Sequence, residues 1–275
     1  MRGISGLLVL TLCLSLRAEE PATTPPPVQD NSFLLEEAYN QEAGVVQTIQ
    51  TYQRSTDAPH DWFYTLTQEW PVPGEKHQLS FSLPIQQVTG DRRARGAGDL
   101  ALNYRYQLLG DGDAPLAIAP RFTVLAPTGN EGRGLGAGGW GIQVALPVSV
   151  VVSPKLVGHV NLGATWVPRA RNDAGERAGT FSPYAGASLV WLTGPTFNLF
   201  VETLYANVES VAGPGRVEGK NTFVVSPSFR WALNFKRGLQ VVTGFAVPIG
   251  VGPSAGETGL LFYLSFEHPV WRAGK

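Results

Sequence analysis

The sequence has 275 residues, of which 16% are charged, and its formal net charge is −1. The near-neutral balance leaves no basic surface, which argues against a nucleic-acid partner. The 32 glycines and 21 prolines favour many short strands joined by turns over a helical protein. No stretch reaches the roughly 18 consecutive apolar residues that a transmembrane helix needs.

Residues 1–18 are typical of a signal peptide. Arg2 gives a positively charged start, and the apolar stretch 7–16 has the length of a signal-peptide core. With cleavage near Ala18, the mature chain contains no cysteine, because Cys13, the single cysteine, lies in that stretch. We therefore expect an exported protein without disulfide or thiol chemistry.

Residues 19–44 differ in composition from the rest and are expected to lie in the periplasm. Prolines between positions 21 and 27 predict an extended linker. Asn31 and Ser32 are suitable caps for a short helix over 33–39, which Gly44 would end. The apolar side of this helix is expected to pack at the periplasmic mouth of the following domain and consists of Leu34, Leu35, Ala38 and Tyr39.

From residue 45 onward, apolar and polar side chains alternate with a period of two, which is typical of strands. Each alternating segment is about long enough to cross a bilayer at a tilt. The segments are 45–54, 61–72, 77–87, 98–109, 115–126, 138–152, 156–168, 181–192, 196–207, 221–234, 239–249 and 259–267. The sequence thus predicts an all-β fold, a transmembrane antiparallel β-barrel of about twelve strands over residues 45–275.

The predicted connections alternate in length. Tight links follow the fourth, sixth, eighth and tenth strands, as at 153–155, whereas longer links rich in glycine and charge follow the odd-numbered strands from the third, as at 89–97. Outer-membrane barrels have short periplasmic turns and long outer loops, so both termini are expected in the periplasm. Prolines inside predicted strands are expected to sit at bulges or strand ends, and they are Pro84, Pro120, Pro147, Pro183 and Pro227.

Aromatic residues support insertion into the outer membrane of a Gram-negative bacterium. Six tryptophans lie near strand ends on the apolar face, where interfacial girdles form: Trp62, Trp70, Trp140, Trp166, Trp191 and Trp231. The last strand ends on aromatic Phe266, like the strands that the barrel-assembly machinery recognises. The expected partners are this machinery, outer-membrane lipid and lipopolysaccharide. The alternative is an exported soluble β-sandwich, which would bury its apolar faces against each other.

If the apolar face meets lipid, the opposite face lines the lumen. The predicted lumen-lining residues are Glu69, Asp99, Asn103, Arg105, Arg121, Gln143, His159, Asn161, Tyr184, Glu202, Arg230 and Tyr263. Their opposed charges have two interpretations. They form either a network that braces and closes a narrow barrel, or a polar passage with a transverse field for small solutes.

Motifs that suggest catalysis do not fit their surroundings. The glycines at 134, 136 and 139 match a dinucleotide pattern, but a strand and not a helix follows them. The 252–256 stretch matches a nucleophile elbow but falls in a hairpin loop. His159 and Asn161 share a face without the serine that an outer-membrane phospholipase needs. We therefore expect no enzyme activity, no cofactor and no metal.

Three short motifs, at 33–47, 98–106 and 125–129, resemble those of the outer-membrane family named after the meta-cleavage pathway of phenol degradation. The resemblance implies an outer-membrane transporter for small, often aromatic compounds, and it provides no functional residues. The preferred hypothesis is a passive channel for small hydrophobic or aromatic solutes. The alternative is a non-transporting structural or adhesion barrel whose paired charges close the lumen.

Overall fold

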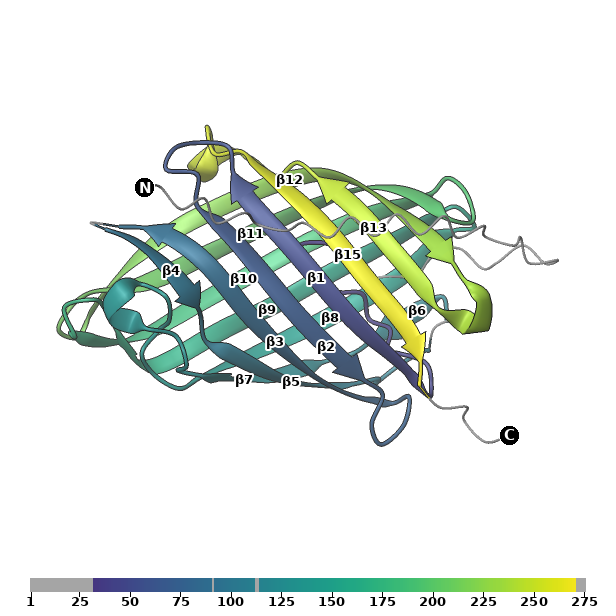
Figure 1. The fold of residues 1–275 in the computed structure, drawn as a ribbon, viewed down its shortest axis with the longest axis horizontal. Coiled ribbons are helices and arrows are strands. Elements are labelled where there is room, and N and C mark those ends of the chain that lie inside the picture. The colour runs from purple at the N-terminus through teal and green to yellow at the C-terminus, as the bar shows by residue number, and fades with distance from the viewer. Residues whose placement is uncertain (1–31, 91, 112–113, 271–275) are drawn as a thin grey trace, which may run out of the picture.

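The computed structural model describes residues 32–90, 92–111 and 114–270, which form a closed antiparallel barrel (Figure 1). The signal peptide and proline-rich linker expected before residue 32 lie outside the described residues. The strands are β1 (Val45–Ser55), β2 (Trp62–Trp70), β3 (His77–Thr89), β4 (Arg93–Ala97), β5 (Leu100–Tyr106), β6 (Leu116–Ile118), β7 (Arg121–Ala126), β8 (Gly141–Ser153), β9 (Leu156–Arg171), β10 (Arg177–Leu192), β11 (Phe197–Gly213), β12 (Arg216–Asn234), β13 (Gln240–Ala246), β14 (Ile249–Gly250) and β15 (Gly259–Pro269). Three single 3₁₀ turns accompany them, η1 (Glu131–Arg133), η2 (Lys236–Gly238) and η3 (Gly252–Ser254). No helix within the described ranges is long and apolar enough to cross a membrane.

The barrel has twelve strands, because β4 with β5, β6 with β7, and β13 with β14 are each two parts of one interrupted strand. The first and last strands close it. β1 pairs with β15 along its whole length, from Val45 opposite Pro269 to Ser55 opposite Gly259 (purple and yellow in Figure 1). The predicted twelve-stranded antiparallel barrel is confirmed.

Prolines explain the interruptions. Pro84 of β3 faces the gap between β4 and β5, and Pro147 of β8 faces the gap between β6 and β7. Likewise, Pro227 of β12 faces the gap between β13 and β14. A proline has no N–H to donate to its neighbour, so the opposing strand can leave the ladder there at little extra cost. The expected bulges or strand ends are therefore not formed at these three prolines, which lie inside β3, β8 and β12; the neighbouring strand is interrupted instead.

Alternation places apolar side chains outside and polar ones inside. In β5, Leu102 is 49% exposed, whereas the adjacent Asn103 is 6% exposed. Asn103 accepts a hydrogen bond from Thr123 of β7 at 2.7 Å, so the inner face is bonded across strands. The outer face presents a belt of exposed apolar residues, with Trp166 and Trp231 among them. This distribution is what a lipid-facing surface and a polar interior require.

The two ends of the barrel differ. At one end, here called the short-turn end, brief links join β8 to β9 and β12 to β13, and β1 begins there. At the opposite, long-loop end, residues 127–140 form an extended connection. β11 and β12 run further than expected at this end and meet in a two-residue turn at 214–215, where the sequence predicted a longer loop.

The orientation across the membrane remains a prediction that labelling can test. Single cysteines replace Gly90, near the long-loop end, and Lys155, in the β8–β9 turn. A bulky impermeant thiol reagent should label only the Gly90→Cys variant on intact cells, because long loops of outer-membrane barrels face outward. Labelling at Lys155→Cys with protection at Gly90→Cys would reverse the orientation.

The lipid-facing surface is testable at Leu102. Leu102→Arg should destabilise the folded barrel by about 2–4 kcal/mol, because a charged side chain would enter the apolar belt. Leu102→Met is the matched control, since it keeps an apolar side chain of similar volume. Denaturant titration in lipid vesicles measures both variants, and equal stabilities would contradict the assigned outer face.

Candidate functional site: a chain segment inside the barrel

Residues 32–44, here called the lumen segment, lie inside the barrel near its short-turn end. The Ser32 hydroxyl contacts that of Ser188 in β10 at 3.1 Å, and Asn40 and Gln41 donate backbone hydrogen bonds to Gln107 and Gln78 on the β3–β5 side. The segment therefore crosses from one wall of the barrel to another. It leads directly into β1.

The lumen segment is a series of bends, and the short helix expected over 33–39 is not formed. The barrel wall takes the backbone donors that a helix would use internally. The Glu202 carboxylate of β11 accepts the N–H groups of Phe33, Leu34 and Leu35 at 2.9–3.2 Å. Three consecutive N–H groups converging on one carboxylate provide the strong charge-assisted bonds that favour this conformation.

Polar groups of the wall continue this pattern along the segment. Asn161 of β9 accepts the N–H of Glu36 at 3.0 Å and donates to its carbonyl at 2.8 Å. Ser149 of β8 accepts the N–H of Ala38 at 2.8 Å. Buried backbone groups need such partners, so the inner face of the wall is matched to this chain segment.

Glu36 forms ion pairs with two wall arginines. Its carboxylate lies 2.8 Å from Arg121 of β7 and 3.8 Å from Arg105 of β5. Arg105 is almost fully buried, and it also donates hydrogen bonds to the Tyr39 carbonyl at 2.6 Å and to the Asn40 side chain at 2.8 Å. Arg105 thus holds three successive parts of the lumen segment against the wall.

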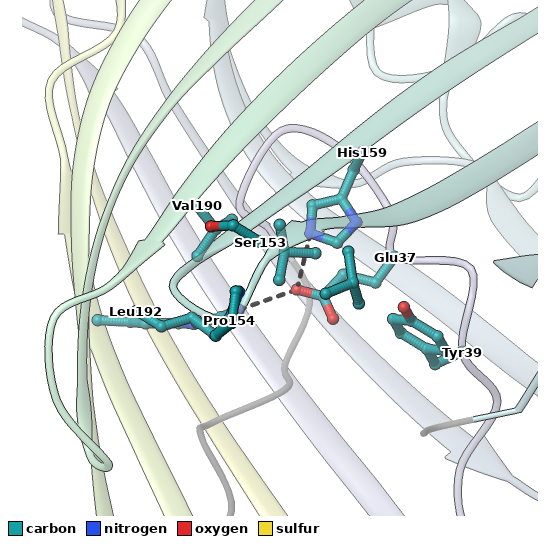
Figure 2. A pocket seen from close by; sticks show the side chains of 10 residues that line it. Glu37, Tyr39, Ser153, Pro154, His159, Val190 and Leu192 are labelled. Atoms are coloured by element: carbon teal, nitrogen blue, oxygen red, sulfur yellow. Dashed lines mark hydrogen bonds and ion pairs between the residues drawn. The ribbon is translucent and has the colours of Figure 1, made fainter. Parts of the chain in front are cut away.

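Glu37 forms the second charged contact, on the opposite side of the interior. Its Oε1 lies 3.2 Å from Nη1 of Arg230 in β12 and 3.5 Å from Nε2 of His159 in β9 (Figure 2). Nδ1 of His159 is 2.8 Å from the Ser149 hydroxyl. Glu37 and Arg230 are both buried, so each needs the other to offset the loss of hydration.

Aromatic and small residues complete the fit. The Phe33 ring packs against Phe200 and Tyr263 with ring centroids 4.8 and 4.7 Å apart. A side chain at Gly244 would collide with this ring, and one at Gly186 would collide with Leu35. These two strand glycines leave room for the segment, as glycines do where another chain approaches closely.

Most of the residues predicted to line the lumen meet the lumen segment. Seven contact it directly: Arg105, Arg121, His159, Asn161, Glu202, Arg230 and Tyr263. Glu69 and Asn103 are buried in bonds to neighbouring strands, and Gln143 accepts a bond from Arg121. Tyr184 lies over Gly163 of β9.

Asp99 has a different role from the other predicted residues. Its carboxylate accepts the N–H groups of Gly129 and Ala137 at 2.9 and 2.7 Å, which fastens the long loop 127–140 to the β4–β5 interruption.

Glu36 and Glu37, the partners of the wall arginines, were assigned to a periplasmic helix. One sequence pattern could have predicted that they lie inside the barrel: they form an adjacent acidic pair just before a barrel whose inner face carries three arginines.

The interior opens toward the long-loop end. Glu202, which binds the lumen segment, and Ser226, its partner across β11 and β12, are 0% exposed. Phe63 shares the inner face of β2 with the buried Glu69 but lies nearer the long-loop end, and it is 42% exposed. Inner-face residues beside the lumen segment are therefore buried, whereas inner-face residues nearer the long-loop end are partly exposed; this end of the interior is here called the vestibule.

The site has no metal-binding arrangement in the part of the chain that the structure describes, since no group of three His, Cys, Asp or Glu side chains is suitably placed. Burial and the nearby Glu37 carboxylate raise the pKa of Tyr39 to about 12, so its phenol stays neutral beside the ion pair. The chemistry available here is binding and charge pairing.

Comparison with known proteins identifies structures that share this fold. The sequence matches no family profile, and a search of curated proteins found no relative. Among solved structures, the COG4313 outer membrane channel from Pseudomonas putida F1 superimposes with a TM-score of 0.68 at 16% identity, covering 84% of this chain and 98% of that one. Weaker likenesses include the CymD monoaromatic hydrocarbon channel, with a TM-score of 0.44 at 9% identity over 85% of this chain and 90% of that one. The KdgM porin has a TM-score of 0.46 at 8% identity over 79% and 98%. The first of these matches shows that this chain has the fold of an outer-membrane channel β-barrel.

Proposed function

We propose that the chain is a passive outer-membrane channel for small organic solutes and that the lumen segment closes it at the short-turn end. The observation that supports the proposal most strongly is the contrast between partly exposed inner-face residues in the vestibule and buried ones beside the lumen segment. A barrel with only a structural role does not need an accessible interior that leads to a separate chain segment. A channel needs both a passage and a means of limiting leakage.

The contacts that hold the lumen segment suit a reversible closure. They are mostly hydrogen bonds and ion pairs, which water and other ions can replace when the segment leaves. Apolar contacts also hold the segment, at Phe33, Leu34 and Leu35 and at Ala38 and Tyr39, and their area has to be exposed when the segment leaves. Such a segment can leave while the twelve-stranded wall, with its own hydrogen-bond ladder, stays intact.

The vestibule favours small solutes with aromatic or mixed character. Phe63 presents an exposed ring there, and the tyrosine at 184 lies deeper on the inner face of β10. The wall charges are of both signs, so neither cations nor anions are strongly preferred. The fold likeness to an outer-membrane channel and the motifs that resemble those of an aromatic-compound transporter family support this assignment by analogy.

The second candidate is a non-transporting barrel. The buried pair of Glu37 and Arg230 favours it, because a permanent brace would use the same contact. The two functions differ in whether the lumen segment can leave without unfolding the wall.

Loosening the ion pairs should expose the lumen segment to protease. In the folded barrel, chymotrypsin should cut slowly after Phe33 and Tyr39. The Glu36→Gln/Glu37→Gln variant should be cut there at least about tenfold faster, because losing one partner of a buried ion pair costs about 3–5 kcal/mol. Glu42→Gln is the control, since Glu42 lies in the same segment but is exposed. Mass spectrometry of the fragments measures the rates, and equal protection in all three proteins would contradict the assigned role of the charges.

The same variants test transport in planar bilayers. Wild-type protein should show rare, small openings, and Glu36→Gln/Glu37→Gln should show longer and more frequent ones, because closure is weakened. Glu42→Gln should behave as wild type. If the double variant remains folded and protease-sensitive in the lumen segment yet never conducts, the transport proposal fails and the structural barrel is correct.

A further inference from the structure

A cavity of about 190 Å³ lies beneath the lumen segment at the short-turn end (Figure 2). Its wall joins strand residues of β8, β9, β10 and β12 to the lumen segment. Ser153, the last residue of β8, and Pro154 of the β8–β9 turn also line it, so the cavity lies near the short-turn end of the barrel. Cavities of roughly 150 Å³ hold a benzene molecule, so a single ring with one small substituent fits this volume.

The cavity has one apolar side and one charged side. Val157, Val190 and Leu192 form the apolar side. Glu37 and Arg230 supply charged groups and His159 a polar one. Tyr39 of the lumen segment stands beside Glu37 (Figure 2). An apolar wall with a few convergent polar groups is the usual composition of a site for a small molecule.

Arg230 determines which substituent the site prefers. Its guanidinium already binds one carboxylate, that of Glu37, through Nη1 at 3.2 Å. Guanidinium groups bind carboxylates in geometrically specific, charge-assisted hydrogen bonds. A carboxylate on a ligand would therefore compete with Glu37 for the same partner.

We propose that this cavity binds a small organic carboxylate, with one ring or a short branched chain, whose carboxylate replaces Glu37 at Arg230. The apolar part of the ligand lies against Val157, Val190 and Leu192. The site deepens the proposed function and rests on it for its consequence, because release of Glu37 removes one of the two charged contacts that hold the lumen segment.

The consequence follows from linkage between the two sites. Two carboxylates beside one buried arginine repel each other, so ligand binding and the Glu37 contact oppose one another. A ligand that binds better when Glu37 is displaced shifts the population toward the displaced segment. The proposal thus makes the lumen segment responsive to organic anions.

Binding is measured by calorimetry on the purified protein in detergent micelles, with benzoate as the probe. Benzamide is the control, because it has nearly the same shape without the charge, and it should bind at least about tenfold more weakly. Glu37→Gln should bind benzoate about tenfold more tightly, since the competing carboxylate is gone, and Glu42→Gln should bind it as wild type does. Equal affinities for benzoate and benzamide, or no benzoate binding, would overturn the proposal.

A variant that fills the cavity, with a matched control outside it, tests where benzoate binds. Val190→Phe should abolish benzoate binding, because the larger side chain occupies the cavity while Arg230 and Glu37 remain. Val160→Phe is the matched control on the lipid-facing side of β9, where Val160 is 46% exposed, and it should leave binding unchanged. Retained binding in a folded Val190→Phe protein would place the ligand elsewhere and overturn the assignment.

Conductance measurements distinguish the proposed carboxylate site from the proposed channel function on which it rests. Benzoate should raise the open fraction of the wild-type protein in planar bilayers, and benzamide should not. If the Glu36→Gln/Glu37→Gln variant conducts but benzoate does not bind, the channel stands and the carboxylate site fails. If benzoate binds but that variant never conducts, the site stands and the channel function fails.

Discussion

Arginines on the inner wall of a narrow barrel impose the constraint on which the rest of this structure depends. Arg105 and Arg230 are almost fully buried, and a buried cation is costly unless a nearby anion and hydrogen bonds compensate it. The wall supplies some of this compensation, but Glu36 and Glu37 come from outside the strands. The lumen segment is therefore part of the electrostatic balance of the barrel.

The wall, in turn, is shaped to receive that segment. Glu202 replaces the internal hydrogen bonds of a helix with three bonds to Phe33, Leu34 and Leu35, and glycines at 186 and 244 remove side chains that would block its path. These features have little use in an empty barrel. Together with the more exposed interior toward the long-loop end, they support the proposal that the lumen segment can leave while the strands remain paired.

Much of the fold could be predicted from the sequence because a barrel wall obeys a local rule. The period of two assigned Leu102 to the outer face and Asn103 to the inner face, and the structure agrees. The strand interruptions opposite Pro84, Pro147 and Pro227 were harder to foresee, because the missing donor lies on one strand and the break on its neighbour. The lengths of β11 and β12 beyond the membrane belt also carried no hydrophobic signal.

The site was less predictable because its key contacts join residues far apart in the chain. Alternation identified Arg105, Arg121 and Arg230 as inner residues, but no local pattern names their partners. The helical spacing of Leu34, Leu35 and Ala38 predicted a helix, because the local sequence pattern does not include the hydrogen bonds that the barrel wall offers to the segment. Glu202, more than 160 residues away, supplies the competing bonds that change the outcome.

The position of the lumen segment inside the barrel is the central claim, and a disulfide tests it directly. The hydroxyls of Ser32 and Ser188 lie 3.1 Å apart, and Cys13 falls in the expected signal peptide, so Ser32→Cys/Ser188→Cys introduces one defined pair. In the folded protein, the disulfide should form rapidly under mild oxidation, and conductance should be lost until a reductant is added. The control pair is Ser32→Cys/Ser182→Cys, in which position 182 lies six residues before Ser188 in β10, and it should not cross-link. Equal cross-linking of both pairs, or of neither, would contradict a segment held at this place in the lumen.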